Sequence, residues 1–211
     1  MAELLLREPD NAALDSPLTL SPEAQDLLFR HAHTTNAFRP EPVDDSRIQA
    51  VYDLVKWAPT AMNSQPLRVL LVRSHQARAR LVPHMAGGNR DRTAAAPLVA
   101  VLAADLDFHD ELPRVFPARP TAREAFADPA ARERAARFSA LLQAGYLILG
   151  LRAAGLGVGP MTGFDADGVD REFFADGAHR ALMVLTMGIP ADRAHRPRQP
   201  RLAYDEVVRT I

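Results

Sequence analysis

The chain has 211 residues, of which 47% are hydrophobic and 24% are charged, and its formal net charge is -1. This balance suits one globular domain, or one subunit of a dimer with a shared core, and it offers no electric field for a nucleic-acid partner. Because the sequence contains no cysteine, it excludes disulfides, zinc–thiolate sites, iron–sulfur clusters and thiol nucleophiles. No apolar run reaches the length of a signal peptide or a membrane span, so we expect a cytoplasmic protein with no membrane partner.

Turn and helix signals divide the sequence into elements in chain order. Residues 1–20 show no periodicity and suit an N-terminal arm, whereas Ser21-Pro22 has the residues that begin a helix. Residues 21–211 are expected to form a single domain in which helices separate buried strands. Its further predicted elements are a helix over 44–57, a polar loop over 60–66, a strand over 69–72, a helix over 75–84, a strand over 97–103, a long connection over 105–132, a helix over 133–154 and a strand over 182–187.

The predicted helix over 133–154 is apolar on more than one face, and Gly155 follows it as a C-terminal cap. A helix that is apolar nearly all round is normally buried, and one small subunit covers such a helix with difficulty. We therefore expect a homodimer. Strands separated by helices indicate an α/β or α+β sheet that is covered on both faces.

Short motifs for several other chemistries are absent or out of context. The glycine-rich stretch over 155–159 is similar to a dinucleotide fingerprint, but a helix precedes it where a strand is required. We therefore interpret it as a helix cap followed by a tight turn. Neither a P-loop nor a nucleophile elbow occurs. His31 and His33 lack a metal-binding motif, and the acidic run over 165–170 suits a solvated helix start, so we expect no metal site.

Four further segments occur in a particular order and spacing. They are His33–Phe38, Ala58–Pro66, Gly159–Asp165, and Pro200–Leu202 followed by Glu206–Val208. Together they resemble the nitroreductase family, specifically its malonic-semialdehyde reductase (3-hydroxypropanoate dehydrogenase) branch. The resemblance implies an α+β, nitroreductase-like fold with a central mixed sheet flanked by helices. It also implies an intertwined homodimer that binds flavin mononucleotide (FMN) at the subunit interface.

The resemblance assigns these segments to different parts of FMN. In the family the first segment lies against the phosphate, where hydroxyl and backbone N–H groups suit an anion. The second runs beside the flavin ring, the third brings backbone N–H groups near N5 and O4, and the basic tail again serves the phosphate. The implied cofactor-binding residues are His33, Thr34, Thr35, Asn36, Pro59, Thr60, Ala61, Met62, Asn63, Pro160, Met161, Thr162, Gly163, Arg198 and Arg201.

Each segment also has a purely structural interpretation when it is taken alone. The first suits a capped turn, the second a polar loop between a helix and a strand, and the third a Gly/Pro turn after a helix. The tail, with Arg193, Arg196, Arg198 and Arg201, suits a solvated basic segment.

The first segment departs from the family pattern at two positions. Many family members carry arginines there, whereas this chain has His33 and Asn36. Histidine is charged only near or below its pKa, but arginine is always charged. Neutralisation of the phosphate would therefore depend on Arg198 or Arg201, and weaker retention of FMN is the hypothesis that follows.

The resemblance implies hydride transfer in two steps, from NADH or NADPH to flavin N5 and then to a small-molecule substrate. Orientation is the main contribution of the protein, and no catalytic side chain is identified. The closest branch suggests reduction of malonic semialdehyde to 3-hydroxypropanoate, with Arg119 or Arg123 as candidates for its carboxylate. Alternatives are a nitro-, quinone- or enone-reductase, a biosynthetic flavin dehydrogenase, and a non-catalytic member that binds flavin or a partner.

Overall fold

The computed structural model describes residues 18–192 and 196–211. The chain divides into two compact units, residues 1–32 and residues 33–211, and each is described by itself. Most of the predicted N-terminal arm and Arg193 of the basic tail lie outside the described residues. In the first unit, α1 (Pro22–Gln25) begins at Ser21, whose hydroxyl accepts a hydrogen bond from the N–H of Ala24 as the sequence predicts, and the π-helical turn η2 (Asp26–Arg30) follows.

The second unit contains one sheet, its covering helices and a C-terminal tail. In chain order its elements are α2 (Asp45–Val55), η3 (Ala61–Asn63), β1 (Leu67–Val72), α3 (His75–Leu81), η4 (Val82–His84), α4 (Gly87–Ala95), β2 (Leu98–Asp105), η5 (Phe108–Glu111), α5 (Leu112–Val115), η6 (Pro120–Phe126), α6 (Pro129–Ala153), β3 (Gly157–Met161), α7 (Ala166–Phe173), β4 (His179–Gly188) and α8 (Tyr204–Val207).

The four strands form one sheet in the order β1-β2-β4-β3. The α+β class and the nitroreductase-like fold are confirmed, but the expectation of a mixed sheet needs correction. All three strand pairings are antiparallel. Parallel pairing occurs in the described residues only as an isolated bridge between Thr34 and Val158. The edge strands β1 and β3 each have one neighbour in the sheet, since the order ends at them.

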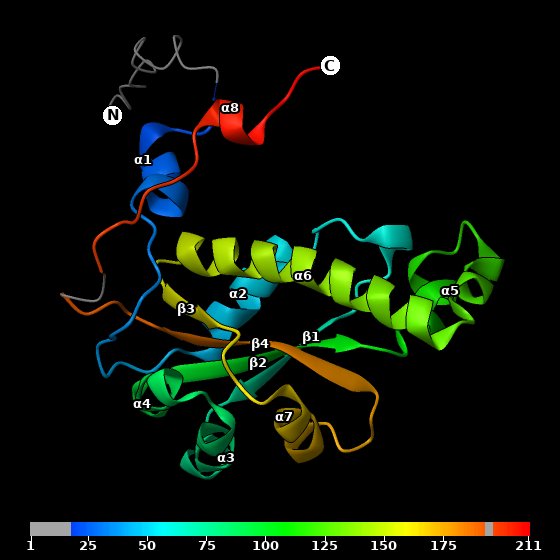
Figure 1. Ribbon diagram of the computed structural model, residues 1–211, viewed down its shortest axis with the longest axis horizontal. Coiled ribbons are helices and arrows are strands. Elements are labelled where there is room, and N and C mark those ends of the chain that lie inside the picture. The colour runs from blue at the N-terminus through cyan, green and yellow to red at the C-terminus, as the bar shows by residue number, and fades with distance from the viewer. Residues whose placement is uncertain (1–17, 193–195) are drawn as a thin grey trace, which may run out of the picture. The chain divides into compact units, whose positions relative to one another are not determined.

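Helices cover both faces of the sheet, which gives the second unit three layers (Figure 1). Strand β2 is buried along its whole length because its alternate side chains enter different cores. On the α2 and α6 side, Leu98 and Leu102 pack with Leu147 and Leu151 of α6. On the α3, α4 and α7 side, Val99 and Val101 of β2 belong to a second cluster. A third cluster forms under α5 and η6 around Phe108.

The glycine-rich stretch after α6 is where the sequence interpretation was wrong. The helix ends as expected, with Gly155 in the left-handed region at φ +73°. The tight turn predicted beyond it is instead strand β3, which pairs with β4 from Gly157↔Gly188 to Met161↔Val184. Glycine and proline have low strand propensity, so the local sequence does not predict this strand. It forms because β3 pairs with β4.

Two other regions contain more structure than the sequence predicts. The long connection over 105–132 contains η5, α5 and η6, and α6 begins within it at Pro129. Helix α4 follows Ala86 at a position where no helix was predicted. By contrast, α7 begins at the acidic run as expected, with the Asp165 carboxylate accepting from the N–H of Gly168. Among the described residues, no helix has both the length and the apolar character needed to cross a membrane.

Candidate functional site

The first and third segments of the predicted site meet at strand β3. The N–H of Thr35 donates to the carbonyl of Val158 at 2.9 Å, and Thr34 forms the parallel bridge with the same residue. Thr35 is buried, at 1% exposure, whereas Thr34 is exposed and His33 and Asn36 are half-buried. The first segment therefore lies along the outer edge of β3, with Thr34 facing solvent and Thr35 facing the interior.

Close packing at β3 explains its glycines. A Cβ atom on Gly157 would lie 2.6 Å from the Thr35 hydroxyl, and a Cβ on Gly159 would lie 2.7 Å from the Thr35 carbonyl oxygen. The hydroxyl of Thr186 on β4 donates to the carbonyl of Gly159 at 3.3 Å. Only glycine allows the first segment to approach the strand this closely.

The third segment leaves β3 and is fixed at the start of α4. The carbonyl of Gly163 accepts from the N–H of Ala86 and from the side-chain amide of Asn89, each at 3.0 Å. Met161 is buried and packs in the second core cluster, so its side chain is structural. Thr162 and Gly163 are exposed, and the N–H of Gly163 has no acceptor among the described residues. An exposed, unpaired N–H is available to a ligand acceptor.

Arg92 of α4 also lies in this region, although it is not among the residues predicted to bind the cofactor. Its guanidinium lies 3.6 Å from the position that a Cβ of Gly159 would take. Its Nε is buried and has no hydrogen-bond partner in the described residues. Burial lowers the pKa of Arg92, and the nearby charge of Arg196 lowers that pKa further. A partly buried cation beside a second cation is an arrangement that an anion would stabilise.

The basic tail supplies further cations, and the two arginines predicted to serve the phosphate lie in different surroundings. Arg198 lies near Arg152 at the end of α6, where burial and then the charge of Arg198 lower the pKa of Arg152. Arg201 donates to the carbonyls of Gln199 and Pro200 in its own tail. The tail therefore brings Arg196 and Arg198 toward arginines of the helices. No local motif in the sequence indicates these pairings, because they join residues that are distant in the chain.

The second segment forms a loop with unusual backbone geometry. Met62, Asn63 and Gln65 have φ values of 53°, 51° and 46°, in a region that costs roughly 1–2 kcal/mol for each non-glycine residue. The side-chain amide of Asn63 donates to the carbonyl of Val115 at 2.7 Å. The hydroxyl of Thr60 accepts from the N–H of Gln65 at 3.2 Å. Strained backbone of this kind often occurs at functional sites.

The exposed members of this loop are Pro59, Ala61 and Asn63. Next to the loop lies a cavity of about 250 Å³ that is lined by basic and polar side chains, by the acidic Glu111 and by two apolar residues. Its lining includes Tyr52, Lys56, Ser64, Gln65, Arg68, Arg114 and Gln143.

Within one chain, loop 59–66 does not lie beside the first and third segments. The loop leads into β1 and the other segments lie on β3, and these are the two edges of the sheet. Three strand spacings separate the edges, which corresponds to roughly 14 Å. Among the described residues no hydrogen bond joins loop 59–66 to either segment. The segments predicted to form the site therefore lie in two separate groups within one chain. The described residues contain no group of side chains that could hold a metal.

An antiparallel sheet between two helical layers, with Arg92 and Arg196 close together beside β3, defines an α+β protein with a cationic region at one sheet edge. The sequence pattern described as the Nitroreductase family matches residues 29–189. The chain belongs to the nitroreductase family.

Individual relatives agree with this assignment. A Streptomyces coelicolor protein, provisionally named NADH dehydrogenase/NAD(P)H nitroreductase, is 58% identical over 195 residues, which cover 92% of this chain and 99% of the relative. A provisionally assigned nitroreductase from Exiguobacterium sibiricum, solved in complex with FMN, aligns with a TM-score of 0.80 at 18% identity, covering 90% of this chain and 98% of that one. A Staphylococcus epidermidis protein, provisionally named NAD(P)H:FMN oxidoreductase, aligns at 0.77 and 16% identity, covering 93% and 99%. These two structures are similar in fold.

Proposed function

We propose that the chain is an FMN-dependent oxidoreductase that takes hydride from NADH or NADPH and passes it to a small-molecule acceptor. The observation that carries the proposal is Arg92, whose buried Nε lacks a partner where the first and third segments meet. The phosphate of a flavin mononucleotide would supply negative charge, and the carbonyl oxygens of its ring would supply hydrogen-bond acceptors. The names of the relatives, which include a 58% identical protein named as an NAD(P)H nitroreductase, support the same reaction class.

The residues present fit this cofactor. When bound, FMN supplies the redox chemistry by accepting hydride from the nicotinamide and donating it to the substrate. The exposed N–H of Gly163 is suited to a ring acceptor, and Thr162 beside it offers a hydroxyl to the ring or to the substrate. Thr34 and Arg92 are suited to the anionic parts. Hydrogen bonds of this kind orient the reactants and tune the cofactor without a dedicated acid or base.

The two separated halves support a homodimer in which one chain contributes loop 59–66 and its partner contributes β3. Helix α6 carries an exposed apolar face that includes Phe138, at 68% exposure, and Tyr146. Gly145 lies on the same helix, and no atom lies within 4 Å of the position that a Cβ would take there. An apolar face of this size on a long helix is typical of a subunit interface.

For the substrate, we propose a small aldehyde such as malonic semialdehyde, which would be reduced to 3-hydroxypropanoate. The resemblance to that branch of the family is the support. A carboxylate on the substrate requires a cation, and Arg119 is exposed in the connection before α6. Arg123 is the weaker candidate, since it forms an ion pair with Asp110 at 2.7 Å.

An absorbance spectrum of the purified protein tests this proposal. We expect a bound flavin spectrum that bleaches with NADH or NADPH under anaerobic conditions and recovers when malonic semialdehyde is added. Recovery with a nitroaromatic, a quinone or an enone, but not with the aldehyde, would keep the reaction class and reject the substrate. A flavin that no nicotinamide bleaches would favour a non-catalytic flavin-binding protein, and absence of flavin uptake would reject the proposal.

A further inference from the structure

The strained backbone of loop 59–66 requires an external support. Three residues close together, Met62, Asn63 and Gln65, have left-handed φ values without being glycine. Such a conformation persists only when surrounding contacts outweigh its strain. The contacts inside the loop, from the Thr60 hydroxyl and the Asn63 carbonyl, hold the N–H and the side-chain amide of Gln65 but not its carbonyl. The Gln65 carbonyl and residues 66–67, where the loop enters the sheet, are held by other elements.

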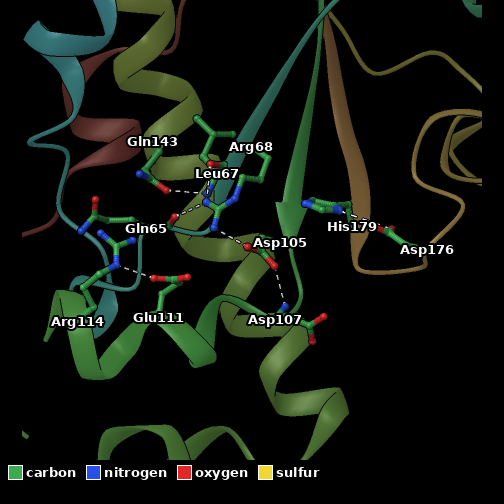
Figure 2. A network of polar contacts seen from close by, with 10 residues as sticks. All are labelled: Gln65, Leu67, Arg68, Asp105, Asp107, Glu111, Arg114, Gln143, Asp176 and His179. Carbon is green, nitrogen blue, oxygen red and sulfur yellow. Dashed lines mark hydrogen bonds and ion pairs between the residues drawn. The ribbon is translucent and has the colours of Figure 1, made fainter. Parts of the chain in front are cut away.

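Arg68 contributes to that support through both terminal nitrogens of its guanidinium (Figure 2). Its Nη1 donates to the carbonyl of Gln65 at 2.9 Å and to the carbonyl of Leu67 at 3.0 Å. Its Nη2 forms an ion pair with Asp105 at the end of β2. One guanidinium thus connects the strained residue to the most buried strand of the sheet.

Two further contacts fix the same end of the loop. The side-chain oxygen of Gln143 on α6 accepts from the N–H of Leu67 at 2.9 Å. The N–H of Asp105 donates to the carbonyl of Pro66 at 2.9 Å. The other carboxylate oxygen of Asp105 accepts from the N–H of Asp107 at 2.8 Å. Both oxygens of Asp105 are therefore engaged, and the carboxylate that holds Arg68 is itself held.

We propose that Arg68, oriented by Asp105, is a positioning residue that holds loop 59–66 in the conformation needed against the flavin ring. Arg68 acts through the carbonyl of Gln65 and does not contact the exposed loop residues Pro59, Ala61 and Asn63. This inference rests on the proposed function. It assigns affinity for the cofactor to a residue that lies behind the loop and outside the predicted contact set.

The geometry requires an arginine at this position. A planar guanidinium can donate to two carbonyls with one nitrogen and to a carboxylate with another, at fixed angles. A lysine ammonium has the charge and three donors, but its flexible stem does not fix their directions. Arg68→Lys should therefore restore only part of what Arg68→Met removes. A residue needed merely for charge would be restored fully by lysine.

Arg180 provides a matched control. Its Nη1 donates to the carbonyls of Gly177 and His179, at 3.1 and 2.9 Å, in the same manner as Arg68. It supports the loop before β4, which contains none of the predicted site residues. Arg180→Met therefore removes an equivalent contact at a position that should not affect the flavin.

The experiment measures the FMN dissociation constant by fluorescence titration and amide hydrogen exchange over 62–67 in the flavin-free protein. We expect Arg68→Met to raise the dissociation constant about tenfold, the loss typical of hydrogen bonds from a charged group, and to speed exchange over 62–67. Arg68→Lys and Asp105→Asn should give intermediate values, while Arg180→Met should change neither quantity.

The possible outcomes separate this inference from the proposed function. Unchanged FMN affinity in Arg68→Met would overturn the positioning role, even if exchange over 62–67 increased. Equal acceleration of exchange along the whole chain would also overturn it, since that result indicates general destabilisation. If the native protein takes up no FMN, the proposed function fails; faster exchange confined to 62–67 would then still support Arg68 as the support of the loop.

Discussion

Loop 59–66 and strand β3 are both predicted to contact FMN, yet the chain constructs them in opposite ways. The loop has strained backbone at Met62, Asn63 and Gln65, and polar side chains hold it in place. Strand β3 has regular pairing with β4, and its glycines admit Thr35 at distances that no side chain would allow. The conformation of the loop depends on hydrogen bonds from polar side chains. The close packing at β3 depends on glycines that have no Cβ atom.

This difference determines which changes each half tolerates. The loop loses stability when a hydrogen-bonding group is removed, by about 1 kcal/mol for a typical bond. The strand loses stability when volume is added, because neighbouring backbone must move. The two halves also lie on opposite edges of the sheet, so a variant in one half leaves the other intact within the same chain.

The largest expected effect is on enzymatic activity, when the two chains of a dimer carry variants in different halves of the candidate site. Asn63→Ala damages the loop and Arg92→Glu damages the β3 region, and each variant alone should lose most FMN-dependent activity. Mixed dimers from co-expression should regain about half of the native sites, since each mixed dimer contains one intact combination and one doubly damaged one. The measurement is NADH oxidation by doubly tagged, affinity-purified material.

Co-expression of two differently tagged copies of Asn63→Ala is the control, and it should regain nothing. Absence of recovery in properly mixed dimers would mean that both halves act within one chain. That result would contradict the proposed interface.

The next largest effect is expected from volume added at β3. In Gly159→Ala the new methyl group would lie 2.7 Å from the Thr35 carbonyl and would also meet Thr186. We expect the free energy of unfolding to fall by about 1–3 kcal/mol, as measured by urea titration. Gly88→Ala is the control, because no atom lies within 4 Å of the added group; alanine in a helix should leave stability unchanged or raise it. Equal stability of the two variants would contradict the packing argument.

Much of the fold could be predicted from local sequence, and the exceptions have physical reasons. Ser21 marks the start of α1 and Asp165 the start of α7, because cap residues act on the next turn alone. Strand β3 was missed, since Gly157 and Gly159 satisfy a constraint from Thr35, which is more than a hundred residues away in the sequence. Long-range contacts of this kind leave no periodic signal.

The candidate site could be predicted in its segments but not in its geometry. The motifs identify loop 59–66 and the region around Gly163, yet which segments meet depends on strand order. Arg92 has no motif of its own among 25 lysines and arginines, so only its position beside Gly159 distinguishes it. The left-handed backbone of Met62 was equally hidden, since glycine and asparagine are the residues that usually signal it.

Removal of the Arg92 charge should have an intermediate effect that separates binding from folding. Hydrogen bonds to charged groups contribute about 1.5–3 kcal/mol, so Arg92→Met should raise the FMN dissociation constant at least tenfold. The flavin-free protein should keep its stability, because the buried Nε has no partner to lose. Fluorescence titration and thermal unfolding measure the two quantities. Arg171→Met, at an exposed position of α7 on the sheet face opposite α6, is the control, and equal FMN affinity of both variants would reject Arg92 as a cofactor ligand.

The smallest effect is expected from one hydrogen bond within the loop. Thr60→Val removes the hydroxyl that accepts from the N–H of Gln65 at 3.2 Å and keeps the shape of the side chain. A neutral bond of this kind contributes about 1 kcal/mol, so the FMN dissociation constant should rise about fivefold, as measured by fluorescence titration. Thr60→Ser keeps the hydroxyl and should retain most of the native affinity. If Thr60→Val retains the native affinity while Thr60→Ser loses it, the methyl group rather than the hydroxyl holds the loop, and the contrast with the close-packed strand no longer holds at this position.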